Sequence, residues 1–452
     1  MLDVVDVKKT VDNKFWKHIT KDTLFPDKQS KTKDKTIEKI VLRVNQGIYL
    51  SSGVKEFIIF SKSRTKANRI ARIVPSFYVE DYVLLYYLLK KIEIELSQGI
   101  HPNAFGSFRN FKYFRDKEKH NHELLGWDSL PSLASASSFY KNYWIFEWKE
   151  FMGKARRVFK DPSYKFFIMF DIADFYSSIN LLLLERKIRS AVSKEKQIFV
   201  DLLFYFLQHS NNKFKKYIPE MKGIPQDEVG DASRLLANFF LQSFDYDLNI
   251  FASKLNGKVL RYSDDHIIYA RDEKSAEKIL FYASIQLQKI GLSINGAKVK
   301  DYKSRSEFKN YWGFDIHDLL DKNQWRKGAN EYIKRGRNDF RWETVLFRFL
   351  LSSSTKLDLV DYMAICKEFL DDSLVSTLEH AQILRLYNFL PKAEQNNFLI
   401  QLDKLISKTN FNVYHYNLIK AIDKNIQFKK YFSSKKKEKI KKRLKELKNY
   451  FD

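Results

Sequence analysis

Two adjacent carboxylates, Asp264 and Asp265, are the residues of this sequence best suited to chemistry. They stand in the middle of Val259–Ala270, between two short apolar runs that predict strands on either side of a tight turn. Two anions ~4 Å apart repel by roughly 4 kcal/mol at an intermediate dielectric. A divalent cation relieves that repulsion, and hard oxygen ligands suit Mg²⁺. One further carboxylate would complete a two-metal site for phosphoryl transfer.

Asp171 is the candidate for that further carboxylate, because it closes the apolar strand predicted over Phe166–Phe170. A buried strand gains nothing from a charge at its end, so a purely structural role explains Asp171 poorly. Asp174, three residues later, is explained as well by capping the turn that follows it. We therefore expect Asp171 to meet Asp264 and Asp265 at one edge of a sheet.

The elements that position these carboxylates follow from the periodicity of apolar residues and from turn signals. Asn256-Gly257 predicts a turn directly before the strand that leads to Asp264. Tyr311–Phe314 is expected to form a short aromatic hairpin element, and the chain after about Asp318 is expected to be helical. Earlier helices are predicted over Phe77–Leu96, as two helices within Leu181–Gln208, from Ser233 to about Phe251, and over Glu273–Ile290.

Charge predicts the kind of partner. Lys and Arg number 80 against 55 Asp and Glu, which leaves a formal net charge of +25. Such an excess predicts a polyanion such as nucleic acid, either RNA or DNA. Two basic segments, Lys62–Arg72 and the tail Lys435–Lys448, are candidates for phosphate contacts. A solvated surface explains each of these segments at least as well.

Cysteine usage and hydropathy predict the compartment. The single cysteine, Cys366, excludes an internal disulfide and a cysteine-rich zinc site. No apolar run has the length to span a bilayer, and the N-terminus lacks the pattern of a signal peptide. From these features we expect a cytoplasmic protein with no membrane partner.

Taken in order, the motifs between Lys62 and Phe314 resemble those of prokaryotic reverse transcriptases. The run Phe170–Tyr176 resembles the first catalytic motif of that family, and Tyr262–Asp265 resembles its Tyr-X-Asp-Asp signature. The other matching segments are Gly223–Gln226 with Ser233–Asn238 (template and nucleotide binding), Gly291–Lys298 (the motif with a lysine), Tyr311–Phe314 (primer grip), and Ala104–Arg109 with Lys62–Arg72 (fingers).

This resemblance implies a DNA polymerase that uses two Mg²⁺ ions, with Mn²⁺ as an alternative. One ion would activate a primer 3′-hydroxyl, and the other would neutralise the triphosphate and the leaving pyrophosphate. The implied metal ligands are the side chains of Asp171, Asp264 and Asp265 and the backbone carbonyl of Ile172.

The resemblance also implies roles for residues around the carboxylates. Lys298 would protonate the leaving pyrophosphate, although Lys300 competes for that role. Tyr176 would stack under the sugar and block a 2′-hydroxyl, with a core aromatic as the alternative. The remaining implied nucleotide contacts are Arg69 or Arg72 to the triphosphate and Gln226 to the incoming nucleotide.

The sequence departs from the family pattern in the loop after Gln226. Asp227 stands where most relatives have glycine, and with Glu228 it makes this loop acidic. An acidic loop beside a template strand would repel phosphates, which puts ordinary templating in question. The small change to Ser263 in the Tyr-X-Asp-Asp signature, where alanine is commoner, is expected to be tolerated.

A compact chain with a helical C-terminal extension is most similar to the antiviral, defence-associated reverse transcriptases of bacteria. More narrowly, the Phe77–Glu93 helix and the acidic loop resemble the second subunit of the type-three systems. That resemblance implies a partner reverse transcriptase subunit, a non-coding RNA and an oligomer.

We therefore expect an α+β fold of right-hand polymerase shape. An N-terminal and fingers region would span 1–155, a palm with an antiparallel sheet and helices behind it 156–318, and a helical thumb-like region 319–452. The expected function is the addition of dNTPs to a 3′-hydroxyl on nucleic acid. Two alternatives stay open, a palm polymerase that uses ribonucleotides and a non-catalytic nucleic-acid-binding subunit. Tyr176 argues against the first, and the three carboxylates argue against the second.

Overall fold

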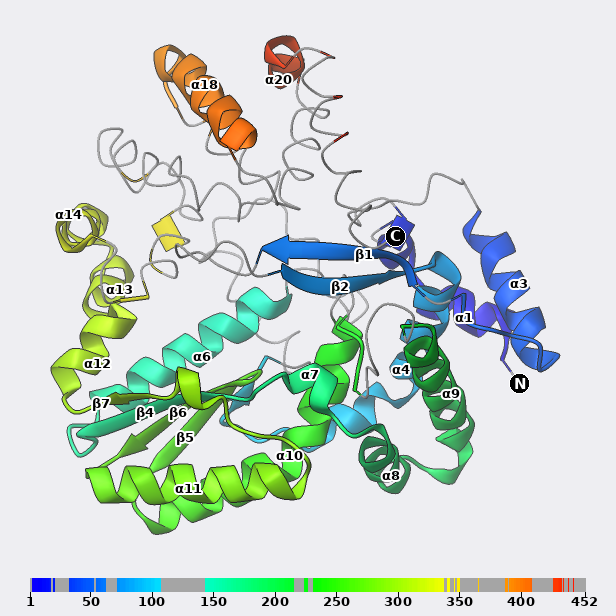
Figure 1. Ribbon diagram of the computed structural model, residues 1–452, viewed down its shortest axis with the longest axis horizontal. Coiled ribbons are helices and arrows are strands. Elements are labelled where there is room, and N and C mark those ends of the chain that lie inside the picture. The colour runs from blue at the N-terminus through cyan, green and yellow to red at the C-terminus, as the bar shows by residue number, and fades with distance from the viewer. Residues whose placement is uncertain are drawn as a thin grey trace. The chain divides into compact units, whose positions relative to one another are not determined.

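A computed structural model gives the arrangement of helices and strands (Figure 1). The described residues are 2–17, 19–20, 32–52, 54–61, 71–106, 143–214, 223–226 and 231–336, with parts of 340–442, chiefly 390–408 and 426–432. The chain divides into two compact units. The first comprises Met1–Glu56, Pro75–His122 and Asp128–Phe308, and the second comprises Phe57–Val74, Glu123–Trp127 and Lys309–Asp452.

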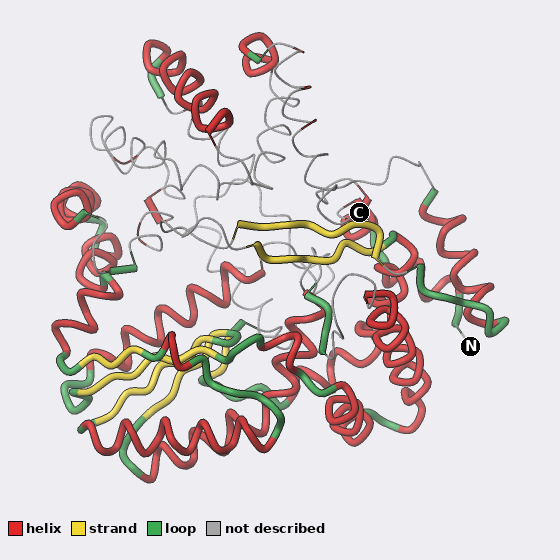
Figure 2. Tube along the Cα trace, viewed as in Figure 1, coloured by secondary structure: helices red, strands yellow, loops and turns green. Residues whose placement is uncertain are grey.

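The first unit contains a five-stranded sheet (Figure 2). Its spatial order is β3-β5-β6-β4-β7. The strands β4 and β6 are buried almost throughout, as their continuous apolar runs predict. Their bounds are Ala104–Phe105 (β3), Phe166–Asp171 (β4), Lys258–Tyr262 (β5), Asp265–Ala270 (β6) and Lys300–Tyr302 (β7).

The expected α+β class is confirmed, and the antiparallel strands expected within 156–318 belong to a mixed sheet, because β3 from outside that span adds a parallel edge. The strands β4, β5, β6 and β7 pair antiparallel, whereas β3 runs parallel to β5. Two backbone bonds hold this edge, from Arg261 N–H to the Asn103 carbonyl at 2.9 Å and from Ser263 N–H to the Phe105 carbonyl at 3.1 Å. A two-residue strand carries no periodicity, so the sequence had no signal for this pairing.

The two faces of the sheet are covered by different helices (Figure 1). Helix α6, Tyr143–Lys160, lies on one face, where the Tyr269 hydroxyl donates to the Ala155 carbonyl at 3.3 Å. Helices α10, Asp231–Lys254, and α11, Glu273–Lys289, cover the other face, where Phe244 meets His266 edge to face. Because side chains alternate along a strand, neighbouring residues of β6 enter opposite layers of the core.

The remaining helices of the first unit match the apolar periodicity closely. The helix expected over Phe77–Leu96 is α4, Val79–Gln98, and the two helices expected within Leu181–Gln208 are α8 and α9. Helix α4 starts later than expected because Phe77 belongs to strand β2. The other bounds are Val4–Thr10 (α1), Asn13–Lys17 (α2), Lys33–Asn45 (α3), Phe175–Ser178 (α7), Leu181–Ala191 (α8) and Gln197–Phe214 (α9), with 3₁₀ turns at Lys194–Lys196 (η3) and Gly296–Lys298 (η4).

The aromatic segment Tyr311–Phe314 is helical, so the expected hairpin element is wrong. Helix α12, Arg305–Trp312, starts where the Ser304 side chain accepts the Glu307 N–H at 3.1 Å. Ser304 and Glu307 have the spacing of a capping box, a helix-start signal that outweighs the short aromatic run. Gly313 has a φ of 62° and separates α12 from α13, Phe314–Asp321.

The other described elements include a two-stranded sheet formed by β1, Val54–Ser61, and β2, Ala71–Phe77. Where the chain after Asp318 is described, it is largely helical, in the rest of α13 and in α14 (Trp325–Arg335), α18 (Lys392–Lys408) and α20 (Ile426–Tyr431). Most of the basic tail Lys435–Lys448 and Cys366 lie outside the described residues. Within the described part of the chain, no helix combines the length and apolar character that crossing a membrane requires.

Candidate active site

The three predicted carboxylates meet at one end of the sheet. Strands β5 and β6 form the expected hairpin, with Asp264 in its turn and Asp265 opening β6. Asp171 ends β4 directly opposite Asp265 in the antiparallel register, and is buried, at 5% exposure. The Ile172 N–H donates to the Asp264 carbonyl at 3.3 Å. Residues far apart in the chain therefore converge because β4 and β6 are neighbours in the sheet.

The buried setting of Asp264 opposes its ionisation. Burial, the charges of Asp265 and Asp171, and a side-chain hydrogen bond with Asp171 together raise the pKa of Asp264 to about 7. A carboxyl group that ionises so reluctantly marks a place where negative charge is poorly compensated. This is the electrostatic situation that the adjacent carboxylates of the sequence predict.

Lys298 is the cation that the structure places beside these carboxylates. It ends the 3₁₀ turn η4, and its Nζ forms an ion pair with a carboxylate oxygen of Asp171. Backbone contacts hold the turn there, since the Asn295 N–H donates to the Asp171 carbonyl at 2.8 Å. Burial lowers the pKa of Lys298, but the contact with Asp171 and the charges of Asp264 and Asp265 raise it above its ordinary value.

The donor set fits a divalent cation. All three groups are carboxylates, the ligand type that Mg²⁺ prefers, and the raised pKa of Asp264 shows that one half-exposed lysine compensates their charge incompletely. As the side chains lie, no group of three carboxylate, histidine or cysteine side chains among the described residues forms a ready metal cage. Asp171 is engaged by Lys298, so a bound cation would have to compete with that lysine.

Tyr176 lies beside the turn that carries Ser263 and Asp264. It belongs to the short helix α7, and its hydroxyl is 3.3 Å from the Ser263 hydroxyl. The Tyr176 carbonyl accepts the Ile224 N–H at 2.9 Å, so the segment Gly223–Gln226 packs against α7. A Cβ at Gly223 would lie 2.0 Å from that same carbonyl oxygen, so only glycine permits this approach. The half-buried Gln226 follows directly.

The other predicted site residues are placed only in part. Arg72 lies on β2, but its side chain is outside the described residues, as are all of Arg69 and the acidic pair Asp227-Glu228. Lys300, the alternative to Lys298, lies on β7 opposite Met169. The structure thus brings together Asp171, Ile172, Asp264, Asp265, Lys298 and Tyr176, with the Gln226 segment packed against Tyr176.

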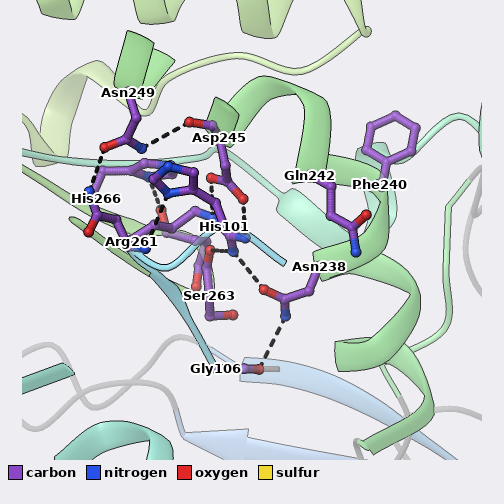
Figure 3. A network of polar contacts seen from close by, with 12 residues as sticks. His101, Gly106, Asn238, Phe240, Gln242, Asp245, Asn249, Arg261, Ser263 and His266 are labelled. Carbon is purple, nitrogen blue, oxygen red and sulfur yellow. Dashed lines mark hydrogen bonds and ion pairs between the residues drawn. The ribbon is translucent and has the colours of Figure 1, made fainter. Parts of the chain in front are cut away.

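A buried polar network behind the turn was not predicted (Figure 3). Arg261 on β5 is 2% exposed, and its guanidinium makes a two-point ion pair with Asp245 of α10 at 2.7 and 2.6 Å. The same guanidinium donates to Asn238 Oδ1 at 2.8 Å and to the Ser263 carbonyl at 2.7 Å. Burial raises the pKa of Asp245, and the charge of Arg261 opposes that shift.

This network fixes the turn that carries Asp264. Ser263 has a φ of 56°, an uncommon conformation for a residue other than glycine, and Arg261 binds its carbonyl. Gly106 lies so close that a Cβ there would be 2.9 Å from the Ser263 nitrogen, and the Gly106 carbonyl accepts from Asn238. A lone arginine inside an apolar strand was the available sequence signal, because such a charge requires a buried partner.

His266 occupies the layer on the opposite side of β6 from Asp265. It is fully buried, stacks on Phe170 with ring centroids 4.3 Å apart, and its Nδ1 is 3.0 Å from the Asp264 carbonyl oxygen. Burial and the charge of Arg261 hold the pKa of His266 well below its ordinary value. A neutral imidazole therefore supports the turn without adding charge to the carboxylate site.

Comparison with known families agrees with this geometry. Residues 114–316 match the family model described as reverse transcriptase (RNA-dependent DNA polymerase). Over this segment, which is less than half of the chain, the sequence is similar to that family. The matched segment contains Asp171, Tyr176, Gln226, Asp264, Asp265 and Lys298, whereas Arg69 and Arg72 precede it.

No curated protein matches the sequence. Among solved structures, the chain is similar to apo telomerase from Candida tropicalis at 11% identity and a TM-score of 0.33, over 85% of this chain and 73% of that one. It is also similar to Candida tropicalis telomerase in complex with a TWJ fragment of telomeric RNA at 13% identity and a TM-score of 0.34, over 91% and 67%. The corresponding Candida albicans complex has 10% identity and a TM-score of 0.30, over 89% and 70%.

Proposed function

We propose that this protein is an RNA-directed DNA polymerase that adds dNTPs to a 3′-hydroxyl with the help of divalent metal ions. The observation that carries the proposal is the meeting of Asp171, Asp264 and Asp265 at the end of the sheet, within a segment that matches the reverse transcriptase family. When bound, two Mg²⁺ ions, or Mn²⁺ in their place, would supply Lewis-acid activation of the hydroxyl and neutralisation of the triphosphate.

The residues of this chain have distinct parts in the proposed reaction. The primer 3′-oxygen forms a bond to the α-phosphorus, and the bond from that phosphorus to pyrophosphate breaks. The three carboxylates would hold the cations, with the Ile172 carbonyl as a further ligand. Lys298 is protonated at neutral pH because its pKa is raised, so it can give a proton to the leaving pyrophosphate.

Tyr176 is the proposed selector against ribonucleotides. Its hydroxyl lies 3.3 Å from that of Ser263 and its backbone is held by Ile224, so the ring is fixed close to the carboxylate turn. Gln226, Arg69 and Arg72 are proposed to contact the incoming nucleotide. If Tyr176→Ala admits NTPs while wild type takes only dNTPs, the selector role is supported, and equal discrimination by both proteins would contradict it.

The decisive experiment is incorporation of labelled dNTPs on a primed RNA template with Mg²⁺. We expect wild-type protein to extend the primer and Asp264→Asn to lose at least about a thousandfold, because several kcal/mol of charge stabilisation are removed. Asp272→Asn is the matched control, since Asp272 is an exposed helix cap away from the turn. Extension by Asp264→Asn at the wild-type rate would refute the proposal and favour a non-catalytic nucleic-acid-binding subunit.

The biological setting of this polymerase is a separate proposal, which the sequence resemblance alone supports. We propose an antiviral role in bacterial cytoplasm, as the second subunit of a type-three system with a partner reverse transcriptase and a non-coding RNA. Phage plaque counts on cells that carry the complete system or its Asp264→Asn variant test this role. Equal protection by both would separate defence from polymerisation.

A further inference from the structure

The palm sheet carries a second polar feature at the end opposite to the carboxylates. A hollow of about 730 Å³ opens between the end of α10, the start of β5 and the end of β6. Lys258, which starts β5, lies four residues before Tyr262, a separation of about 13 Å along the strand. The residues that line this basic hollow are His101, Asn103, Tyr164, Asn249, Ile250, Ser253, Lys254, Asn256, Gly257, Lys258 and Arg271.

The lining is cationic without a compensating anion. Lys254 and Arg271 are exposed, Lys258 is half-buried, and none of the three forms an ion pair with a described residue. No described lining residue is Asp or Glu. Outside the hollow, hydrogen bonds from Ser163 lower the pKa of Asp161, and the charge of Arg271 contributes to that shift. The hollow therefore presents a net positive field to the solvent.

Hydrogen bonds between side chains fix the floor of the basic hollow. Asn103 is buried, at 9% exposure, and its side-chain nitrogen donates to Asn249 Oδ1 at 2.7 Å. The Asn249 side chain in turn donates to the Asp245 carbonyl at 2.9 Å, which ties the floor to the helix that holds Arg261 (Figure 3). The rings of His101 and Tyr246 pack edge to face with centroids 4.8 Å apart.

The negative end of α10 does not cancel this field. A helix C-terminus normally exposes carbonyl oxygens that repel anions. Here the Ala252 carbonyl accepts both the Leu255 N–H at 3.0 Å and the Gly257 N–H at 2.8 Å, and the Ser253 carbonyl accepts the Asn256 N–H at 3.0 Å. The turn into β5 therefore satisfies these carbonyls, and an anion can approach Lys254 and Lys258.

We propose that the basic hollow binds the phosphate backbone of a single nucleic-acid strand outside the polymerase site. An open, strongly basic surface hollow suits a polymer that passes along it, and phosphate contacts need no base recognition. The side chains proposed to contact phosphates are Lys254, Lys258 and Arg271. Tyr164, half-exposed in the same lining, offers a ring for base stacking.

The test measures binding of fluorescein-labelled single-stranded oligouridylate to the full chain by anisotropy over a range of salt concentrations. EDTA and the Asp264→Asn background remove any metal-dependent binding at the carboxylates. In the triple variant K254Q/K258Q/R271Q, we expect the slope of log K against log salt to become shallower by about 2, from three contacts at ~0.7 each. Affinity at low salt should fall at least about tenfold.

The matched control is K274Q/K278Q/K289Q, which removes the same charge from exposed lysines of α11. An equal loss in both triple variants would overturn the proposal, because it would show a general charge effect. The single exposed substitution K254E tests the same point if the triple variant does not fold, and unchanged binding by K254E would also overturn it. If free UMP displaces the oligonucleotide and binds with the same affinity as the oligonucleotide, the hollow binds a single nucleotide. That result would refute the proposal that it binds a strand.

Discussion

Two groups of charged side chains meet at the β5–β6 hairpin, and they differ in how their charge is compensated. Asp245 is buried with Arg261, and the two-point ion pair and its neighbours satisfy both side chains. Asp171 forms an ion pair with the half-exposed Lys298, and the pKa of Asp264, which lies beside Asp171 and Asp265, is raised to about 7. The charge of Arg261 opposes the rise in the pKa of Asp245, whereas the carboxylates beside Asp264 add to the rise in its pKa.

This difference separates a positioning role from a chemical one. A buried ion pair whose guanidinium also binds Asn238 and the Ser263 carbonyl holds a conformation, here the Ser263 turn. A buried carboxylate cluster that carries excess negative charge stores unfavourable energy until a cation arrives. The protein retains that unfavourable arrangement a few residues from a fully satisfied one, which supports a function for it.

The largest expected effect on stability tests the satisfied group. Arg261→Met leaves Asp245 buried without its partner, and we expect the free energy of unfolding to fall by about 3–5 kcal/mol. Denaturant titration followed by circular dichroism measures this loss. The control is Arg189→Met, which removes half-exposed surface pairs with Glu185 and Asp201 and should cost about 1 kcal/mol. Equal losses in the two variants would show that the Arg261–Asp245 pair contributes no more to stability than a surface ion pair.

The pH dependence of stability tests the uncompensated group. In the metal-free protein, Asp264 binds its proton with a folded pKa of about 7 against an ordinary value of 3.8. The folded state therefore holds more protons than the unfolded state between about pH 4 and pH 7, so the free energy of unfolding falls as pH rises, by up to about 4 kcal/mol.

Asp264→Asn sharpens that measurement because asparagine does not titrate. We expect the variant to be more stable than wild type at pH 8 in EDTA, and to show a flatter stability profile between pH 4 and pH 7. Urea unfolding at several pH values measures both quantities. A wild-type profile without the fall, or an unchanged slope in the variant, would contradict the assignment of buried, uncompensated charge to this carboxyl.

Binding of a divalent cation should offset the free-energy cost of ionising Asp264. We expect Mg²⁺ to raise the melting temperature of wild type at pH 8, with a stabilisation up to about 3 kcal/mol at ~100 times its Kd. The rise should be smaller at pH 6, where Asp264 is mostly protonated, and absent in Asp264→Asn. An equal rise in that variant would place the bound Mg²⁺ elsewhere.

The smallest expected effect concerns Lys298. This lysine engages Asp171, so Lys298→Met should increase Mg²⁺ affinity by no more than about fivefold, the equivalent of ~1 kcal/mol for a half-exposed pair. The same variant should lower the rate of nucleotide incorporation if Lys298 protonates pyrophosphate. Calorimetry measures the first quantity and single-turnover kinetics the second. Lys289→Met, on the exposed side of α11, should change neither.

The sequence by itself determined the main local elements and the identity of the candidate chemical groups. Long apolar periodicity predicted α4, α10 and α11 to within a few residues, and adjacent aspartates in an apolar hairpin signalled a cation site. The sequence predicts these features because helix and strand periodicity, turn residues and repulsion between charges each depend on residues that are close together in the chain. The hairpin element expected over Tyr311–Phe314 is wrong because Ser304 caps a helix that continues to Trp312.

Only the tertiary structure decided which distant residues meet. The parallel edge strand β3, the Arg261–Asp245 pair and the choice of Lys298 at Asp171 each join segments that no local pattern connects. The same holds for the basic hollow, where Arg271, directly after β6, meets Lys254 and Lys258 of the turn from α10 into β5. The physical reason is that pairing across a sheet and burial of a charge depend on which strands become neighbours. The packing of the whole core sets the order of the strands.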